Sequence, residues 1–362
     1  MISRIITIAL VGMSASAFAQ RNDPNARARQ QAERFFQQHD KNDDGKLSRD
    51  EFPQNVKQLF GRIDTNRDGF VDLNEDIKFR AGRNRPGQNR SQLAKGFVTA
   101  KDIEYAEVGG KSLLLDIYFP KQSKEALPLI VWIHGGAWRA GSKDRCPALR
   151  FLEKGFVVAS INYRLTHEAI FPAQIQDCKA AIRWLRANAK KYRVDPKRVG
   201  VWGSSAGGHL VALLGTSGDV NELEGTGGNL DQSSRVQAVV DFFGPTDLLQ
   251  MDAHALPSAP FKHDDPDSPE SKLIGGPIQE NKDKAARANP IKYISSDDPP
   301  ILIVHGDSDP LVPHHQSQIF YEALKKAKVD VRFHTVKGAG HGFGRNEDVE
   351  RMVDKFFSEK LR

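Results

Sequence analysis

From about residue 97 onward, short apolar runs alternate with segments of helical spacing, and this alternation constrains the fold more than any other feature of the sequence. Residues 113–119 alternate as a half-buried strand does, whereas the later runs are continuously apolar, as in buried parallel strands. Residues 173–192 have helical spacing. The pattern predicts an α/β domain with a doubly wound, mostly parallel sheet. The predicted strands are residues 113–119, 129–133, 157–161, 199–202, 236–240, 301–304 and 331–335.

The first 19 residues differ in character from the rest of the chain. Arg4 precedes an apolar stretch, and Ala17-Phe18-Ala19 matches a small-residue cleavage signal. We expect residues 1–19 to be a cleavable signal peptide and the mature protein to be secreted or periplasmic; a short uncleaved tether is the alternative. No apolar run reaches the roughly 20 residues that span a bilayer, so no membrane span is expected.

Composition and charge argue against several other classes of protein. Two cysteines, Cys146 and Cys178, are too few for a disulfide-stapled scaffold; whether they bond to each other is left open. The net charge of +6 is densest at residues 80–90, where arginines alternate with Gly, Pro and Asn but not with aromatic residues. We therefore expect no nucleic-acid partner, and we interpret residues 81–96 as a linker.

A candidate nucleophile lies in the segment GSSAG at 203–207, which fits G-x-S-x-G with Ser205 at its centre. The apolar run 199–202 leads into the segment and a helix-like stretch leads out, so Ser205 would stand on a sharp strand-to-helix turn. Small residues are needed on either side of such a turn. An alcohol is a weak nucleophile at neutral pH and needs a neighbouring base. Ser204 is the competing serine, but it lies one residue out of register.

Two later loops supply candidates for the base and for the acid that orients it. His341 follows the predicted strand 331–335, and both Asp307 and Asp309 follow the predicted strand 301–304. The order serine, acid, histidine is the one found with this kind of turn. His341 would accept the serine proton, and the acid would orient its imidazole ring. Position alone gives only a mild preference for Asp309 over Asp307.

The segment HGGAW at 134–138 directly follows the predicted strand 129–133. Its glycines would allow backbone N–H groups to approach a substrate oxygen. We expect the N–H groups of Gly136, Ala137 and Ala206 to form an oxyanion hole. Trp138 has two interpretations, one in which it lines the substrate pocket and one in which it packs against the sheet.

Together these segments resemble the esterase/lipase branch of the α/β-hydrolase superfamily, near the hormone-sensitive-lipase-like carboxylesterases and the related bacterial feruloyl- and acetylxylan-type esterases. The resemblance covers about residues 97–362 and implies that the acid, the second aspartate of H-G-x-x-D, is Asp309. The sequence departs from the family at Ala137, where a third glycine is usual, and we expect a narrower range of acyl groups for that reason. The matching segments are HGGAW at 134–138, GSSAG at 203–207, HGDSDPLVP at 305–313 and GAGHGF at 338–343.

Residues 40–51 and 64–75 each match the twelve-residue EF-hand calcium loop. Oxygen side chains stand at positions 1, 3, 5, 9 and 12, glycine at position 6, and a backbone carbonyl serves at position 7. The two loops predict an EF-hand pair over residues 20–80, with one shared helix and Ca²⁺ in a structural or docking role. The second loop has four ligand carboxylates against three, so tighter binding is expected there. The predicted ligands are Asp40, Asn42, Asp44, Lys46, Ser48 and Glu51 in the first loop and Asp64, Asn66, Asp68, Phe70, Asp72 and Glu75 in the second.

The sequence thus predicts a secreted serine ester hydrolase that forms an acyl-serine intermediate, needs no cofactor for the chemistry, and carries an EF-hand pair able to dock a partner. The resemblance implies short or aromatic acyl esters, with polysaccharide-linked esters among them. Two alternatives stay open: a serine peptidase or amidase of the same fold, and a calcium-dependent binding protein whose hydrolase domain is inactive. Residues 216–235 and 247–292 are expected to form a lid or rim over the site.

Overall fold

The structure is a computed structural model that describes residues 24–66, 68–84, 96–123 and 125–362. The chain divides into two compact units between Ser91 and Gln92, inside the segment interpreted as a linker. The predicted signal peptide, residues 1–19, and most of the linker, residues 81–96, lie outside the described residues. Among the helices that are described, none is long and apolar enough to cross a membrane.

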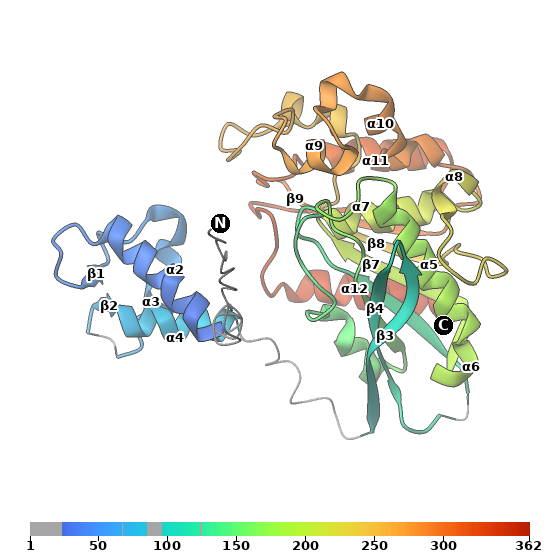
Figure 1. Cartoon of the computed structure of the whole chain (residues 1–362), viewed down its shortest axis with the longest axis horizontal. Coiled ribbons are helices and arrows are strands. Elements are labelled where there is room, and N and C mark those ends of the chain that lie inside the picture. The colour runs from blue at the N-terminus through green and yellow to red at the C-terminus, as the bar shows by residue number, and fades with distance from the viewer. Residues whose placement is uncertain (1–23, 67, 85–95, 124) are drawn as a thin grey trace, which may run out of the picture. The chain divides into compact units, whose positions relative to one another are not determined.

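The larger unit is built on an eight-stranded sheet with the order β10-β9-β8-β7-β5-β6-β4-β3 (Figure 1). β4 runs antiparallel to both β3 and β6, and the other neighbouring strands are parallel. The parallel strands all end at one edge, called here the carboxyl edge. This arrangement confirms the predicted doubly wound sheet. The strands are β3 Phe97–Val108, β4 Lys111–Pro120, β5 Leu127–Ile133, β6 Val157–Ile161, β7 Val194–Ser204, β8 Ala238–Phe242, β9 Ile301–Gly306 and β10 Val331–Val336.

Each predicted strand is present, but β7 begins five residues earlier than expected and β8 begins two residues later. β3 was not predicted, because it is an edge strand whose residues are mostly exposed or half-buried. The predicted helix 173–192 is present as two helices, α5 Ala173–Ala187 and α6 Ala189–Tyr192. The division falls at Asn188, whose backbone N–H and side-chain amide both donate to the Trp184 carbonyl and so close α5.

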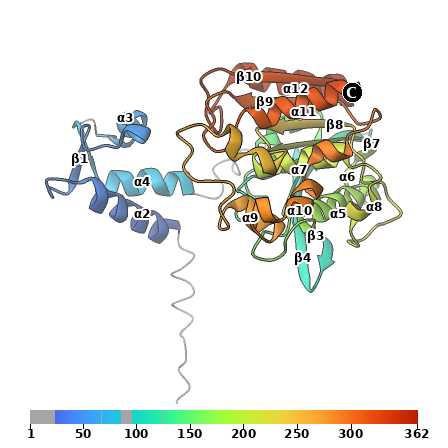
Figure 2. The same ribbon diagram turned by 90° about the horizontal axis from the view of Figure 1, so that it is seen from above.

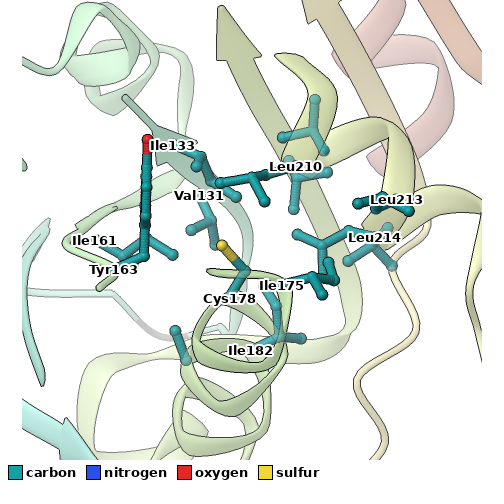
Figure 3. Packing of buried hydrophobic residues seen from close by; sticks show 14 of the residues in the cluster. Val131, Ile133, Ile161, Tyr163, Ile175, Cys178, Ile182, Leu210, Leu213 and Leu214 are labelled. Atoms are coloured by element: carbon teal, nitrogen blue, oxygen red, sulfur yellow. The ribbon is translucent and has the colours of Figure 1, made fainter. Parts of the chain in front are cut away.

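Both faces of the sheet are buried, which explains the continuous apolar runs in the sequence. Val131 and Ile133 of β5 face a core shared with α5 and α7 (Figure 3), and Leu129 belongs to the same core. Ile130 and Trp132 face a second core, shared with η2 and α12. Helices therefore cover the sheet on each side, as the views from the front and from above show (Figures 1 and 2). The covering helices are α7 Ala206–Thr216, η2 Pro147–Lys154, α11 His315–Lys326 and α12 Glu347–Leu361.

The two cysteines lie in different cores, on opposite faces of the sheet. Cys178 is surrounded by apolar side chains of β5, β6, α5 and α7 (Figure 3), whereas Cys146 directly precedes η2 in the second core. Both are free and buried, so the disulfide that the sequence left open is not formed. Burial raises the pKa of Cys146 to about 12, so this thiol stays protonated at neutral pH.

Residues 216–235 do not lie at the carboxyl edge. α7 begins there, directly after Ser205, and runs back along the sheet to Thr216. The segment that follows contains α8 Asn221–Glu224 and leads to the start of β8 at Ala238, at the opposite edge. The expectation that residues 216–235 form part of a lid is therefore wrong.

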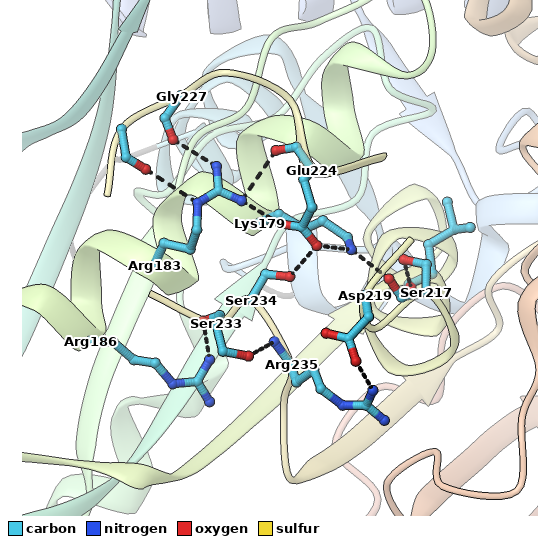
Figure 4. Close-up of polar contacts among 12 residues, drawn as sticks. Lys179, Arg183, Arg186, Ser217, Asp219, Glu224, Gly227, Ser233, Ser234 and Arg235 are labelled. Carbon is cyan, nitrogen blue, oxygen red and sulfur yellow. Dashed lines mark hydrogen bonds and ion pairs between the residues drawn. The ribbon is translucent and has the colours of Figure 1, made fainter. Parts of the chain in front are cut away.

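Buried cations of α5 hold this segment in place. Lys179 Nζ donates to the Ser217 carbonyl and to Glu224 Oε1, each at 2.6 Å. Arg183 binds Glu224 Oε2 at 2.5 Å and the Gly227 carbonyl at 2.7 Å (Figure 4). The side chains of Lys179 and Arg183 are each only 1% exposed. Because a buried ion must be paired, these contacts decide the path of the segment.

Residues 247–292 leave the sheet at the carboxyl edge, after β8, and contain α9 Pro269–Ile274 and α10 Lys282–Arg287. The Phe171 N–H donates to the Leu273 carbonyl at 2.7 Å. The Ala288 carbonyl accepts a hydrogen bond from His209 Nε2 at 2.6 Å, and burial lowers the pKa of His209 to about 4. The segment thus packs against the first turns of α7, in keeping with the expected rim.

The smaller unit contains the two EF-hand loops and a short ribbon between them. Leu47 and Val71 are paired at the centre of this antiparallel ribbon, and both are buried with Phe36, Phe52 and Phe60. The predicted shared helix is present as two short pieces, a 3₁₀ helix and an α-helix. The elements are α2 Pro24–His39, β1 Lys46–Ser48, η1 Gln54–Leu59, α3 Phe60–Ile63, β2 Phe70–Asp72 and α4 Leu73–Asn84.

We expect Glu224→Ala to lower the free energy of unfolding by at least about 2 kcal/mol, because Lys179 and Arg183 would lose their carboxylate partner inside the protein. Glu222→Ala, on the same short helix but with exposed contacts, should change it by less than about 0.5 kcal/mol. Denaturant unfolding of the full chain measures both. Equal effects of the two substitutions would contradict the role given to the buried cluster.

Candidate active site

Ser205 lies in the sharp turn between β7 and α7, at the carboxyl edge. Its backbone angles are φ +55° and ψ −123°, a strained conformation for a residue with a side chain. The Ser205 N–H donates to the Phe242 carbonyl at 2.8 Å, and the Ser205 carbonyl accepts from the His209 N–H at 3.0 Å. These two hydrogen bonds hold the strained residue, and the predicted turn geometry is confirmed.

The glycines of GSSAG are required by close backbone contacts. A Cβ added at Gly203 would lie 2.2 Å from the Gly207 carbonyl oxygen. A Cβ added at Gly207 would lie 2.2 Å from the carbonyl oxygen of Ile133, on the neighbouring strand β5. Ser204 and Ser205 are half-buried, whereas Gly203 and Ala206 on either side of them are buried.

His341 and Asp309 meet in the loops that follow β10 and β9. His341 Nδ1 lies 2.7 Å from Asp309 Oδ2, which leaves Nε2 free to face a reacting group. The other candidate acid, Asp307, instead accepts the Gly338 N–H at 2.6 Å and so ties the two loops together. The geometry therefore selects Asp309 as the partner of His341, as the family resemblance implied.

Asp309 is buried, and its carboxylate is held by hydrogen bonds from several directions. Oδ1 accepts the N–H groups of Leu311 and Val312 at 2.8 and 3.0 Å. Burial opposes ionisation of Asp309, but hydrogen bonds from His305 and His341 outweigh it, and the pKa of this carboxyl lies well below its usual range. The group is thus a fixed negative charge next to His341 across the ordinary pH range.

Phe242 and Phe243, at the end of β8, connect the serine turn with the histidine loop. The Phe242 carbonyl binds the Ser205 N–H, and the Phe243 ring contacts the His341 ring with 4.6 Å between centroids. Among the described residues no hydrogen bond joins the Ser205 hydroxyl to His341, so the proton transfer between them stays a prediction. Such bonds are often formed only once substrate is bound.

The predicted oxyanion loop lies directly beside the serine. A Cβ added at Gly135 would be 3.3 Å from the Ser205 Cβ. Gly136 and Ala137 have φ values of +118° and +54°, so a residue with a side chain occupies the left-handed region at Ala137. A glycine would accept this conformation without strain. Ala206 is the first residue of α7, so its N–H has no acceptor within the helix.

Two residues of this loop, His134 and Trp138, are held by contacts with neighbouring rings. Trp138 is buried and contacts the His209 ring edge-on at 5.3 Å, so of its two interpretations packing within the core is correct. His134 stacks on Tyr163 at 4.4 Å, and the Tyr163 hydroxyl donates to the His134 carbonyl at 2.9 Å. Backbone N–H groups held this rigidly can stabilise a developing negative charge on an oxygen.

Sequence reasoning missed Asp241, a buried carboxyl at the end of β8 and behind the serine turn. Its Oδ1 accepts the Gly244 N–H at 3.0 Å, and a Cβ added at Gly208 would lie 2.4 Å from the same oxygen. Burial raises the pKa of Asp241 to about 7. The signal available in the sequence was an aspartate inside an otherwise apolar run.

The EF-hand loops have the predicted shape, with Gly45 and Gly69 at φ +78° and +87°. Glu51 accepts the backbone N–H groups of Lys41 and Ser48, which closes the first loop, and Glu75 closes the second in the same way. In the part of the chain that is described, no three His, Cys, Asp or Glu side chains converge on one point, because these carboxylates bind their own loop amides. The other predicted ligands, Asp40, Asn42, Asp44, Lys46, Ser48, Asp64, Asn66, Asp68, Phe70 and Asp72, lie along the same two loops.

One atom of the second loop lacks a hydrogen-bond partner although it is buried. This is Oδ1 of Asp64, the residue at position 1 of the loop. A buried carboxylate oxygen without a donor is unfavourable, and a cation at the loop centre would satisfy it. The residues of this loop therefore fit a calcium ion.

Comparison with known proteins agrees with this geometry. The BD-FAE family model matches residues 115–324, and an EF-hand model matches residues 32–54 and 56–75. Esterase LipQ of Mycobacterium tuberculosis is 32% identical over 76% of this chain, but this chain spans only 64% of the length of LipQ.

Solved structures extend the likeness to three dimensions. A truncated carbohydrate esterase from gut microbiota has a TM-score of 0.67 and 38% identity, over 75% of this chain and 98% of that one. Esterase Est2 of Thermogutta terrifontis, with propionate bound, has a TM-score of 0.59 and 28% identity, over 74% of this chain and 96% of that one. On the family match and the shared fold, the chain belongs to the BD-FAE family of α/β-hydrolase esterases and carries an EF-hand region before that domain.

Proposed function

We propose that this protein hydrolyses short acyl esters carried on carbohydrate, through an acyl-serine intermediate formed at Ser205. The observation that carries the proposal is the Asp309–His341 hydrogen bond at the edge where the strained Ser205 turn opens. The likeness to a carbohydrate esterase over nearly all of that chain supports the substrate class.

The mechanism follows from the placement of the groups. Ser205 Oγ attacks the ester carbonyl carbon while His341 Nε2 accepts the hydroxyl proton, and Asp309 stabilises the imidazolium through Nδ1–H. The N–H groups of Gly136, Ala137 and Ala206 receive the negative charge on the carbonyl oxygen. His341 returns the proton to the leaving alcohol. Water then attacks the acyl-serine while His341 accepts a proton from it. His341 returns that proton to Ser205 Oγ as the bond between Oγ and the acyl carbon breaks, and the carboxylic acid is released.

Two further properties belong to the same proposal. The EF-hand loops bind calcium in a structural or docking role, supported by the unsatisfied Asp64 oxygen and by the EF-hand match. The protein is exported, supported by the cleavage signal within residues 1–19. Calcium takes no part in the ester chemistry as proposed.

The decisive assay is hydrolysis of p-nitrophenyl esters from acetate to laurate, of methyl ferulate, and of acetylated xylan. We expect activity to be highest on the short acyl esters, since Ala137 restricts the space at the oxyanion loop. Cleavage of peptide or amide substrates without ester hydrolysis would favour the peptidase alternative. A folded protein that reacts with neither substrates nor a fluorophosphonate probe would favour the binding-protein alternative.

Among variants, Ser205→Ala should lower kcat by about 10⁴-fold or more, since no other group can form the acyl intermediate. Asp309→Asn should lower kcat about 10³- to 10⁴-fold, because an amide does not stabilise the imidazolium. Asp307→Asn keeps an acceptor for the Gly338 N–H and should cost less than about tenfold. Steady-state kinetics on p-nitrophenyl acetate measure all three, and a larger loss for Asp307→Asn than for Asp309→Asn would reverse the assignment.

Calcium titration of the full chain by calorimetry should show two sites, with the tighter one in the second loop. Glu75→Gln should weaken the tighter site by at least about tenfold, and Glu51→Gln should do the same to the weaker site. Asp50→Asn is the matched control, because Asp50 is next to Glu51 but occupies no ligand position and is fully exposed. Absence of binding heat in the wild type would contradict the calcium proposal and leave the esterase proposal standing.

A further inference from the structure

His305 is a buried histidine beside the proposed catalytic residues, and the mechanism above gives it no part. It lies near the end of β9 and is fully buried. Nε2 lies 3.2 Å from Asp309 Oδ2 and 3.0 Å from the Val312 carbonyl oxygen, and Nδ1 lies 2.7 Å from Ser317 Oγ. A ring that packs only by its apolar surface would not need three polar partners.

The partners decide which nitrogen carries the proton. Both neighbours of Nε2, the ionised Asp309 carboxylate and the Val312 carbonyl, are acceptors only, so Nε2 must be the donor. Ser317 has a hydroxyl that can donate to Nδ1, which then acts as the acceptor. All three polar contacts of the His305 ring are therefore satisfied in the Nε2–H tautomer. The hydrogen bond from the Ser317 hydroxyl to Nδ1 favours that tautomer.

The carboxylate oxygen that His305 contacts is the same one that binds His341. Asp309 Oδ2 lies 2.7 Å from His341 Nδ1 and 3.2 Å from His305 Nε2, while Oδ1 is held by two backbone N–H groups. Four donors thus fix the plane of the carboxylate, and rotation about its terminal torsion would break them. His341 gains and loses a proton at Nε2 during the proposed reaction, whereas the His305 ring takes no part in that transfer and its donor to Oδ2 does not change.

We propose that His305 is a positioning residue that holds Asp309 in the plane of the His341 ring and limits how strongly its carboxylate attracts the imidazolium. This inference deepens the proposed function and rests on it. The other rings near His305 are Phe243 and His314, with centroids at 6.2 and 5.4 Å, and Asp309 is the charged group bonded to it. No substrate contact is assigned to His305, since it is buried beneath the loop that carries Asp309.

Three substitutions separate positioning from packing. His305→Phe keeps an aromatic ring but removes the donor to Asp309; His305→Gln can place an amide N–H near the position of Nε2; Ser317→Ala removes the hydroxyl that supports the tautomer. His305→Phe should lower kcat/KM for p-nitrophenyl acetate about 10- to 100-fold, the range expected for a lost hydrogen bond to a charged group. His305→Gln and Ser317→Ala should each lower it less than about tenfold.

The pH profile distinguishes this role from a merely structural one. The acid limb of kcat/KM reports protonation of the base that takes the serine proton. A carboxylate that has lost one donor attracts that proton more strongly, so the acid limb should move to higher pH in His305→Phe and stay near the wild-type position in His305→Gln. Thermal unfolding of each variant checks that the protein compared is folded.

An acid limb in His305→Phe that coincides with that of the wild type would overturn the inference, whatever the loss of rate. So would equal losses in His305→Phe and His305→Gln. If the wild type hydrolyses no ester, the proposed function fails, and the downfield proton resonance of the His341 Nδ1–H bond then tests His305 without turnover. Removal of the competing donor should shift that resonance further downfield, and an unmoved resonance would contradict the inference.

Discussion

The crowding of backbone around Ser205 is the constraint on which the rest of the site depends. β5, β7 and β8 are neighbours in the sheet, and the turn after β7 fits between them only because Gly203 and Gly207 lack side chains. Ser205 adopts a strained conformation of the kind that persists only where the surroundings over-determine it. Here the hydrogen bond from the Ser205 N–H to the Phe242 carbonyl and the one from the His209 N–H to the Ser205 carbonyl do so. The oxyanion loop and the histidine loop are then placed relative to this one residue, through β5 and through Phe243.

Buried charge has different roles at the two edges of the sheet. At the carboxyl edge, Asp309 is stabilised by neutral donors, so its charge remains available to a neighbouring imidazolium. At the opposite edge, Lys179 and Arg183 share one carboxylate, Glu224, and these ion pairs hold the segment that connects α7 to β8. Electrostatic stabilisation of a transition state depends on dipoles that are fixed before the reaction. The proposed site is built in that way.

The two units of the chain differ in the size of their apolar cores. The BD-FAE domain buries two apolar cores, one on each face of its sheet. The EF-hand unit has a single small core around Phe52 and Phe60, and small units bury a smaller fraction of their surface. Under the proposed calcium binding, the metal would add folding free energy where the core is least able to supply it. In this proposal calcium stabilises the EF-hand unit and takes no part in the ester chemistry.

Much of this protein was determined by local sequence. Apolar runs specified the strands because both faces of a parallel sheet are buried, and glycine spacing specified the serine turn and both calcium loops because only glycine fits those backbones. The carboxyl-edge placement of Ser205, Asp309 and His341 followed from the strand order along the chain. Sequence alone could not predict the edge strand β3, whose exposed residues lack an apolar pattern.

Tertiary structure decided the features that depend on contacts between distant residues. The choice of Asp309 over Asp307 was only a mild preference from position, and the hydrogen bond to His341 decides it geometrically. The path of residues 216–235 is set by cations on α5, some 40 residues earlier in the chain. The part given to His305 depends on its approach to Asp309 and Ser317 in the folded loop. Such pairings leave no periodic signal, since they arise only when packing brings separate segments together.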